Sequence, residues 1–415
     1  MPAPATPIAQ TSKRRVSYKR ETTYGAAAGA SSAIELRRTA LNLNLSKQAI
    51  ESQEKRSDFQ RADVRHGSRM VDGSLDGELI CGFWEEFWAA LVRRDFTDPT
   101  ASGYSGTSGD GLTISSGVVT RAGGGGGSFL TDGFRVGQIV RFANLSATGN
   151  NNRNFLITAL TATAMTLAVV DGGAAIADIG VADESCTCSV AGMTSYVPAS
   201  GHTSDSFNFE DYLADADLAK VYLGCRIVGL SLRAQPNGMV TLSWRIMGQD
   251  QAVYESGSAP YFTSPTSPGL DNVLESALGY IRLNGAQQAL VTGVNIDIDL
   301  GAANTPVVGA NISPDVFYGR AVTVRGQLTA YVTSHTFTSA YRAETEMELF
   351  LQFQEPGSEP RDFVSLFMPR VKLMSDGLDD PDGPITQTLD FEALLKPATT
   401  GYEATTLMVQ DSTLT

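Results

Sequence analysis

The side chains that most often perform chemistry in proteins are few in this sequence and lack the spacing that a site requires. The 415 residues include only three His and four Cys. Cys186 and Cys188 have the spacing of half a metal site, but a second pair or a nearby His is missing, which favours two ordinary thiols. His66, His202 and His335 lie in polar segments, which favours solvated side chains over ligands or general bases. We therefore expect no metal site.

Catalytic motifs are also missing from the sequence. It contains no Gly-x-Ser-x-Gly, His-Glu-x-x-His or Walker sequence. The five successive glycines at 123–127 are not followed by Lys-Ser or Lys-Thr, so they do not form a phosphate-binding loop. A carboxylate pair for glycoside hydrolysis stays open among the 45 Asp and Glu residues, but no pair stands out. The sequence therefore predicts a protein that is not an enzyme and needs no cofactor.

Acidic residues alternate with apolar ones in several segments, with the period of a β-strand. The acids of three such segments are Asp76 and Glu78, Asp297 and Asp299, and Asp390 and Glu392. The acids of a fourth segment are Glu344, Glu346 and Glu348. Like charges side by side destabilise a sheet, so their repetition indicates a use. Two interpretations stay open, a solvated sheet face and a set of faces that line a water-filled channel.

Positive charge is concentrated near the N-terminus, although the chain has a net charge of −14. Residues 1–70 hold 13 of the 31 Lys and Arg residues and only 6 of the 45 Asp and Glu residues. The basic residues of the polar segment 46–70 are Lys47, Lys55, Arg56, Arg61, Arg65 and Arg69. This asymmetry indicates an acidic partner, either nucleic acid or the acidic body of a neighbouring copy. Interspersed acids and a single nearby aromatic residue, Phe59, favour the neighbouring copy.

A mostly β chain must position these side chains. Alternating or apolar runs at 40–45, 221–233 and 290–300 predict strands. The clearest predicted helix covers residues 83–94, which have an apolar stripe at helical spacing, and a short helix is predicted at 272–282. The polar segment 46–70 predicts an extended loop or arm, because it has almost no aliphatic residues. No apolar run is long enough to span a membrane.

The chain also contains a weak internal repeat and a segment of different composition. Residues 40–45 (ALNLNL) align with 293–298 (GVNIDI), and 74–79 (SLDGEL) align with 323–328 (TVRGQL), at offsets of 253 and 249. Residues 222–228 resemble 365–371, and the turn and strand at 236–246 resemble 381–391 at an offset of 145. An insert of roughly a hundred residues in the first copy accounts for the change in offset. The Gly- and Ser-rich segment 100–195, with its short strand-like runs, has the expected length and position.

The predicted organisation is therefore discontinuous. It consists of an N-terminal arm at 1–33, a first β unit at 34–99 and 196–260, an inserted small β domain at 100–195, and a second β unit at 261–415.

Several motifs occur in a characteristic order along the N-terminal third. They are YKRETTYG at 18–25, LRR at 36–38, NLNL at 42–45, RSD at 56–58, DVRHG at 63–67 and GSLDGEL at 73–79, followed by the aromatic helix. The strand QTLDFEA at 387–393 also fits. In this order the motifs resemble the major tail tube protein of long-tailed, siphovirus-like bacteriophages. The resemblance covers residues 16–95 well and 200–410 more loosely, while 100–195 resembles the small β insertions that decorate tail proteins.

The resemblance implies a structural virion protein and a fold class. The fold is mostly β, with duplicated tail-tube β-sandwich or barrel units, a flanking helix in each unit or in the first, and an outward-facing insert. Such proteins form rings that stack into a tube, and DNA passes through the lumen. The six paired acids become candidates for lining the lumen, and the basic residues of segment 46–70 become candidates for contacts between rings. A chain with two units would form trimeric rings with pseudo-sixfold symmetry.

The resemblance also implies partners and a location. The partners are further copies of the chain, the tape measure, tail terminator and distal tail proteins, and DNA held only transiently in the lumen, with no membrane involved. The location is the virion, and the host cytoplasm during assembly. We expect no sheath, because the insert would obstruct one. Three alternatives remain, namely a tail-completion or distal-tail ring protein, a carbohydrate-binding or adhesin-like β protein, and a hydrolase.

Overall fold

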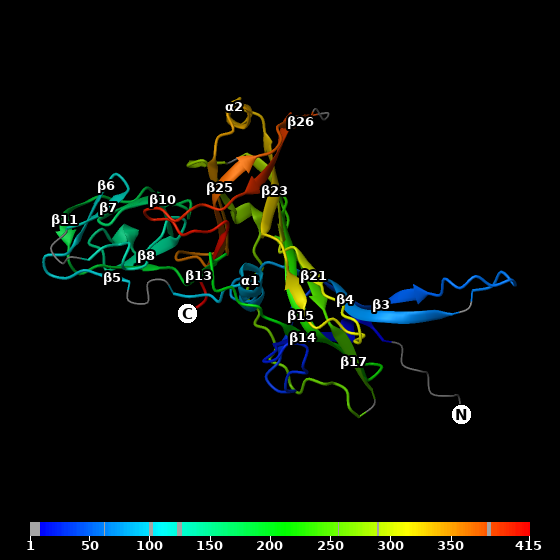
Figure 1. Cartoon of the computed structure of the whole chain (residues 1–415). Coiled ribbons are helices and arrows are strands. Elements are labelled where there is room, and N and C mark those ends of the chain that lie inside the picture. Colours follow the sequence, from blue (N-terminus) through cyan, green and yellow to red (C-terminus); the bar gives the residue numbers. More distant parts are fainter. Residues whose placement is uncertain are drawn as a thin grey trace.

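The computed structural model describes residues 9–61, 63–98, 103–122, 127–255, 257–288, 290–379 and 383–415. The fold is mostly β, which confirms the predicted fold class (Figure 1). The α-helices of the described residues are α1 (Glu85–Val92) and α2 (Thr336–Arg342). Neither helix is long or apolar enough to cross a membrane.

Eight strand segments lie side by side in one continuous antiparallel layer, which we call the long sheet. In spatial order they are β3 (Ala40–Glu51), β4 (Val64–Glu78), β16 (Thr241–Gly248), the second half of β15 (Leu218–Ala234), β20 (Val291–Asp299), β23 (Thr323–Tyr331), β27 (Thr386–Ala393) and the end of β25 (Phe363–Leu373). A hairpin followed by two further strands therefore occurs twice. The first set is β3, β4, β16 and β15, and the second set is β20, β23, β27 and β25. The pairing of β15 with β20 joins the two sets.

A second layer of strands covers one face of each set. β15 changes layers at an irregularity between Ile227 and Gly229, and its first half pairs with β14 and β17. The first half of β25 pairs in the same way with β24 and β28. The outer strands are β1 (Arg14–Arg20), β2 (Ile34–Glu35), β14 (Phe207–Leu213), β17 (Asp250–Glu255), β13 (Met193–Tyr196), β18 (Tyr280–Leu283), β19 (Ala286–Gln287), β24 (Met347–Gln354) and β28 (Met408–Asp411). The apolar faces of the two layers enclose one core.

Helix α1 closes one end of this core with aromatic side chains. Phe87 and Trp88 lie with their ring centroids 5.7 and 5.2 Å from that of Trp244 on β16. The helix is shorter than the predicted range 83–94, because Arg93 adopts a left-handed backbone conformation that ends it. Its residues from Phe87 to Val92 are all buried, so the helix has no solvated face over that stretch.

Three further expectations require correction. The segment predicted as an N-terminal arm contains a sheet strand in its described part, since β1 pairs with β14 along its whole length. The predicted helix at 272–282 is replaced by a 3-10 turn at Ser276–Leu278 and by β18, because Leu274 donates its backbone N–H to the Leu79 carbonyl. Segment 46–70 is largely a hairpin, because β3 and β4 continue to pair as far as Glu51 and Val64.

The strands between residues 104 and 190 form a separate eight-stranded sheet with its own core. They are β5 (Tyr104–Ser105), β6 (Leu112–Ser115), β7 (Val118–Arg121), β8 (Ile139–Ala143), β9 (Phe155–Leu160), β10 (Ala164–Val169), β11 (Ile179–Asp183) and β12 (Thr187–Val190). This sheet follows α1 in the sequence but packs on the outer strands of the second set, where Phe350, Phe363 and Phe367 join its core. The Gln410 side chain fixes the contact through hydrogen bonds with both backbone groups of Ile139.

Candidate assembly surfaces

One face of the long sheet carries a continuous row of polar side chains. Cross-strand pairing places these residues directly opposite one another in the order Asp76, Ser243, Ser231, Asp297, Arg325, Glu392 and Lys372. The apolar neighbours of each residue along its strand point to the core on the other face. Seven strands from two distant parts of the sequence thus present one polar surface.

All six paired acids that the sequence singled out lie on this face. Glu78 is opposite Thr241, Asp299 is opposite Gly229, and Asp390 is opposite Gln327. Each lies two residues along its strand from a member of the row, which places it on the same face. The fourth acidic segment does not belong to it. Glu348 lies on β24 and accepts a hydrogen bond from Tyr402, and Glu346 pairs with Arg370.

The polar face is not purely acidic. Arg245 lies 3.0 Å from the Asp299 carboxylate, and Arg325 lies 3.2 Å from that of Glu392. The other acids with a partner bind neutral groups, since Asp76 accepts from Ser243, Asp297 from Ser231 and Asp390 from Gln327. The sequence did not single out these Arg and Ser residues, although the alternation in 229–233 and 241–245 would have placed them on one strand face.

Both ends of the long sheet are edges without a strand partner among the described residues. At one end, β3 pairs only with β4. At the other end, β26 (Gly377–Asp379) continues the line of β25 and pairs with β27, and no described strand pairs with the opposite side of residues 372–379. Met374 and Leu378 are 50% and 64% exposed there. Unpaired edges of this kind are open to pairing with another chain.

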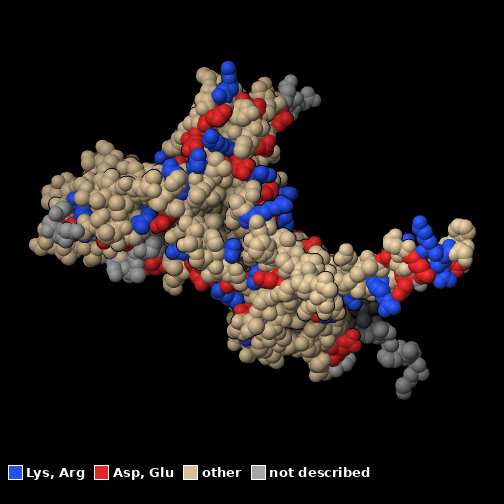
Figure 2. Space-filling view, in the orientation of Figure 1, with Lys and Arg blue, Asp and Glu red and all other residues tan. Residues whose placement is uncertain are grey.

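The far part of the β3–β4 hairpin projects from the body as an arm of residues 46–70 (Figure 1). Figure 2 shows basic and acidic side chains alternating along it. Arg56, Arg61 and Arg65 pair with acids of the arm itself, at 2.9, 2.7 and 2.6 Å. Arg69 pairs with Asp250 of the body, at 3.1 Å. No ion pair involves Lys47 or Lys55 within the described part of the chain.

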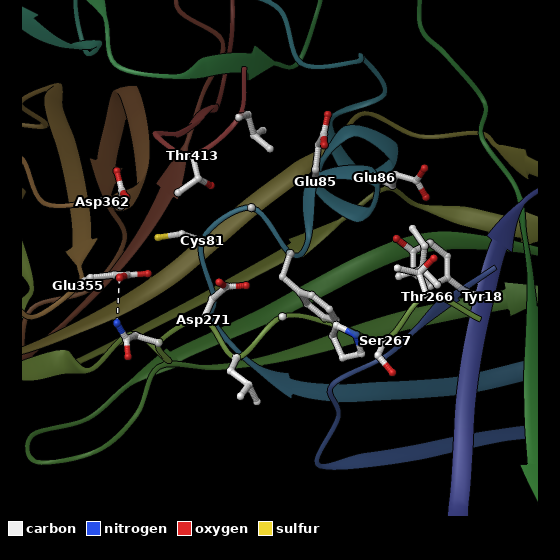
Figure 3. Close-up of a pocket in the computed structure, with 18 residues that line it drawn as sticks. Tyr18, Cys81, Glu85, Glu86, Thr266, Ser267, Asp271, Glu355, Asp362 and Thr413 are labelled. Atoms are coloured by element: carbon white, nitrogen blue, oxygen red, sulfur yellow. Dashed lines mark hydrogen bonds between the residues drawn. The ribbon is translucent and has the colours of Figure 1, made fainter. Parts of the chain in front are cut away.

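A cavity of about 830 Å³ lies between the start of α1, residues 266–272 and the connection between β24 and β25 (Figure 3). Its acids are Glu85, Glu86, Asp271, Glu355 and Asp362. Burial raises the pKa of Glu85 and of Glu86, and the neighbouring Glu86 carboxylate raises that of Glu85 further. The lining residues include no His, Lys or Arg.

The candidate metal and acid–base residues are not gathered into a site. Cys186 and Cys188 are buried free thiols, and burial raises the pKa of both. His66, His202 and His335 are exposed, as the polar sequence context predicted. No group of three or more His, Cys, Asp or Glu side chains in the described residues is arranged to hold a metal ion.

The sheet edges and the polar face are features of a protein that assembles, and comparison with known families agrees. The model of the phage tail tube protein family matches residues 11–393. The chain belongs to the phage tail tube protein family. Comparison with curated proteins gives no match. Membership identifies a structural component of the phage tail, and the tail tube family in general assembles with itself and with other tail components.

Proposed function

We propose that this tail tube family protein polymerises into closed rings, that the rings stack into a hollow tube, and that DNA passes through the lumen. The observation that carries the proposal is the β15–β20 junction, where the first set of strands continues directly into the second. The same junction between chains would join the free edge of β25 and β26 to the free edge of β3 in the next copy. The long sheet then runs from copy to copy and closes on itself, which removes both exposed edges.

The two sets of strands support a division into two β units, at 34–99 with 196–260 and at 261–415, with the insert at 100–195. Three copies then supply six units, so the ring is a trimer with pseudo-sixfold symmetry. The insert faces outward in such a ring. Leu349 and Leu351 of β24 point to the core beneath the long sheet, whereas Phe350 of the same strand points to the insert.

The polar face lines the lumen in this arrangement. Its acids include Asp76, Glu78, Asp297, Asp299, Asp390 and Glu392, and these six outnumber the basic residues of the same face, which are Arg233, Arg245, Arg325 and Lys372. Excess negative charge repels phosphates, while the local ion pairs limit repulsion within the sheet. DNA would pass without being held, because a surface of this charge makes few favourable phosphate contacts.

Stacking of rings is assigned to the basic residues of the arm. The candidates are Lys47, Lys55, Arg56, Arg61, Arg65 and Arg69. Arg69 already forms an ion pair with Asp250 of its own chain. Lys47 and Lys55 are exposed, so they are available to the acidic body of a neighbouring copy. Such contacts between exposed charges weaken with salt, which predicts shorter tubes at high ionic strength.

Electron microscopy of the purified protein, with averaged end-on views, tests the proposal together with the mass of isolated rings. Hollow rings of three chains that stack into tubes are expected. Rings of six chains would contradict the duplicated organisation, and rings that never stack would favour a tail-completion or distal-tail component. Monomers at every concentration and salt, combined with binding to a glycan array, would favour the adhesin-like alternative.

A further inference from the structure

The second set of strands carries a small hairpin that folds back onto the first set. Its strands are β21 (Ala302–Asn304) and β22 (Val316–Tyr318), which follow β20 and precede β23 in the sequence. Arg226 of β15 holds it, since its Nη1 donates to the Val316 carbonyl at 2.7 Å and its Nη2 lies 2.9 Å from the Asp315 carboxylate. Gln249 also donates to the Ser313 carbonyl at 2.7 Å.

The arm contains the counterpart of this hairpin. Glu51 pairs with Val64 and Ala49 with His66 at the far end of β3–β4, as Asn304 pairs with Val316 and Ala302 with Tyr318. The sequence repeats as well, because DVRHG at 63–67 corresponds to DVFYG at 315–319.

The same local hydrogen bond occurs in both hairpins. The Val64 N–H donates to the Asp63 carboxylate at 2.8 Å, and the Val316 N–H donates to that of Asp315 at 2.9 Å.

The two counterparts differ in what covers them. Val316 is fully buried beneath the contacts of Arg226, whereas Val64 is 47% exposed. Ile50 and Phe59 of the arm are 55% and 99% exposed. The arm therefore presents the same Asp–Val pair with the same hydrogen bond, together with apolar side chains that the described part of its own chain leaves uncovered.

A surface that matches the Arg226 site occurs on the second set. Arg370 directly precedes the pairing of β25 with β27, and Arg226 is the first residue of β15 that pairs with β16, so each lies close to the point where its strand passes from the outer strands to the long sheet. The Arg370 Nη1 donates to the carbonyl of Leu395, which lies just after β27. Gln249 of the first set, which contacts the docked β21–β22 hairpin, lies just after β16. The buried Nε atoms of Arg226 and Arg370 both lack a hydrogen-bond partner. Leu395 is 55% exposed, so this surface is uncovered.

We propose that the far hairpin of the arm docks on the Arg370 surface of the neighbouring copy in the same ring. The Asp63 carboxylate then binds the Arg370 guanidinium, and Val64 is covered, as Asp315 and Val316 are on Arg226. Docking exchanges ion-pair partners, because Arg65 leaves Asp63 and meets Glu346, which now pairs with Arg370 at 2.6 Å. Arg65 then belongs to the contact within the ring, and stacking of rings is left to the other basic residues of the arm. The inference rests on the proposed ring and identifies the contact that holds neighbouring chains together.

Disulfide trapping in assembled protein tests the inference. A chain with Val64→Cys and Leu395→Cys is allowed to assemble and is then oxidised, with Val64→Cys and Val181→Cys as the matched control. Val181 lies on the insert and is 83% exposed, and the four native cysteines are buried. Docking within a ring yields cross-linked species that are no larger than one closed ring. The control pair yields no cross-linked species.

The outcomes separate this inference from the proposed function. Tubes that form without a cross-link would overturn docking within the ring. Cross-linked species larger than one ring would overturn it as well, because they would show that the arm reaches the next ring. Failure to form rings or tubes in the unmodified protein would instead contradict the proposed function.

A charge exchange gives a second measurement of the same contact. Asp63→Arg should lower the cross-link yield about tenfold, equivalent to about 1.4 kcal/mol, and addition of Arg370→Asp should restore it. Equal cross-link yields in the cysteine variant alone, with Asp63→Arg, and with Asp63→Arg and Arg370→Asp together would show that Asp63 and Arg370 do not meet.

Discussion

Two adjacent acids at the start of α1 show how position changes the behaviour of a side chain. Glu85 and Glu86 lie in the first turn of the helix, where the helix dipole favours negative charge. Burial nevertheless raises the pKa of both residues, and the Glu86 and Asp411 carboxylates raise that of Glu85 further. Their ionised forms therefore cost stability at neutral pH.

Replacement of Glu85 by Gln should stabilise the isolated chain at pH 7. The folded-state pKa of Glu85 lies above the ordinary value of 4.5, so the folded chain keeps this carboxyl protonated to higher pH than the unfolded chain does. The free energy of unfolding therefore falls as pH rises from the ordinary pKa through the folded pKa. The gain from Glu85→Gln is about 0.5 kcal/mol after solvent screening, and it disappears below the ordinary pKa. Thermal unfolding at pH 7 and pH 4 measures it.

The exposed residue Glu54 provides the control, since Glu54→Gln should leave the melting temperature unchanged at both pH values. A lower melting temperature for Glu85→Gln at pH 7 would mean that attraction to the helix dipole outweighs burial.

At the residue scale, the sequence identified the acids of the polar face but not their partners. Alternation along one strand places Asp297 and Asp299 on a common face, and this follows from local geometry alone. Arg245 and Asp299 are 54 residues apart in the sequence, and their pairing depends on the registers of β16 and β20 against β15, which tertiary packing determines. For this reason the mixed charge of the face was not predicted.

At the scale of elements, two glycines allow aromatic rings to lie flat against the long sheet. A Cβ atom at Gly326 would lie 2.3 Å from Cζ of Phe391 on the neighbouring strand and 2.5 Å from the Asn295 carbonyl. A Cβ atom at Gly77 would lie 2.5 Å from Cζ2 of Trp84. Both glycines therefore serve close packing, in one set of strands each.

Gly326→Ala should destabilise the chain by about 2 kcal/mol, because the added methyl group must displace both a ring and a backbone carbonyl. The control is Gly180→Ala, a strand position where a Cβ atom meets nothing within 4 Å. Denaturant unfolding of the two variants should give a lower midpoint only for Gly326→Ala. Equal midpoints would contradict the close-packing role.

Prediction of elements from sequence succeeded where the pattern was local. The strands at 221–233 and 290–300 and the aromatic helix follow from local patterns, although Arg93 ends the helix early. The polar arm was predicted as a loop because it lacks aliphatic residues, yet its backbone pairs between β3 and β4. A hairpin with both faces solvated gives no hydrophobic alternation, so composition alone cannot reveal it.

At the scale of the whole molecule, the insert joins two distant parts of the chain. It begins after α1 but docks on β24, β25 and β28, where Arg135 lies 2.6 Å from Glu403. Sequence comparison located the insert from the change in repeat offset. The sequence contained no signal for the docking surface, because the apolar residues of the insert and of the outer strands that form it look like ordinary core residues.

The free edges of the long sheet give the sharpest prediction at this scale. If β25 of one copy pairs with β3 of the next, residues on the polar face of both strands come close together, as Ser231 and Asp297 do within the chain. Asn44→Cys combined with Met374→Cys or Lys372→Cys should then form disulfides between chains in assembled rings, and complete oxidation should give covalent trimers on non-reducing gels. Two partner positions are tested because the register between chains is set by packing.

The matched control combines Asn44→Cys with Ser231→Cys. Ser231 occupies the corresponding face of β15, whose edge is already paired with β20, so no disulfide between chains should form. The prediction depends on the edges alone and is independent of the arm. Covalent hexamers would show that six chains share one ring. Assembled rings without any cross-link at either position would mean that the long sheet is not continued from chain to chain, and closure would then have to occur through other surfaces.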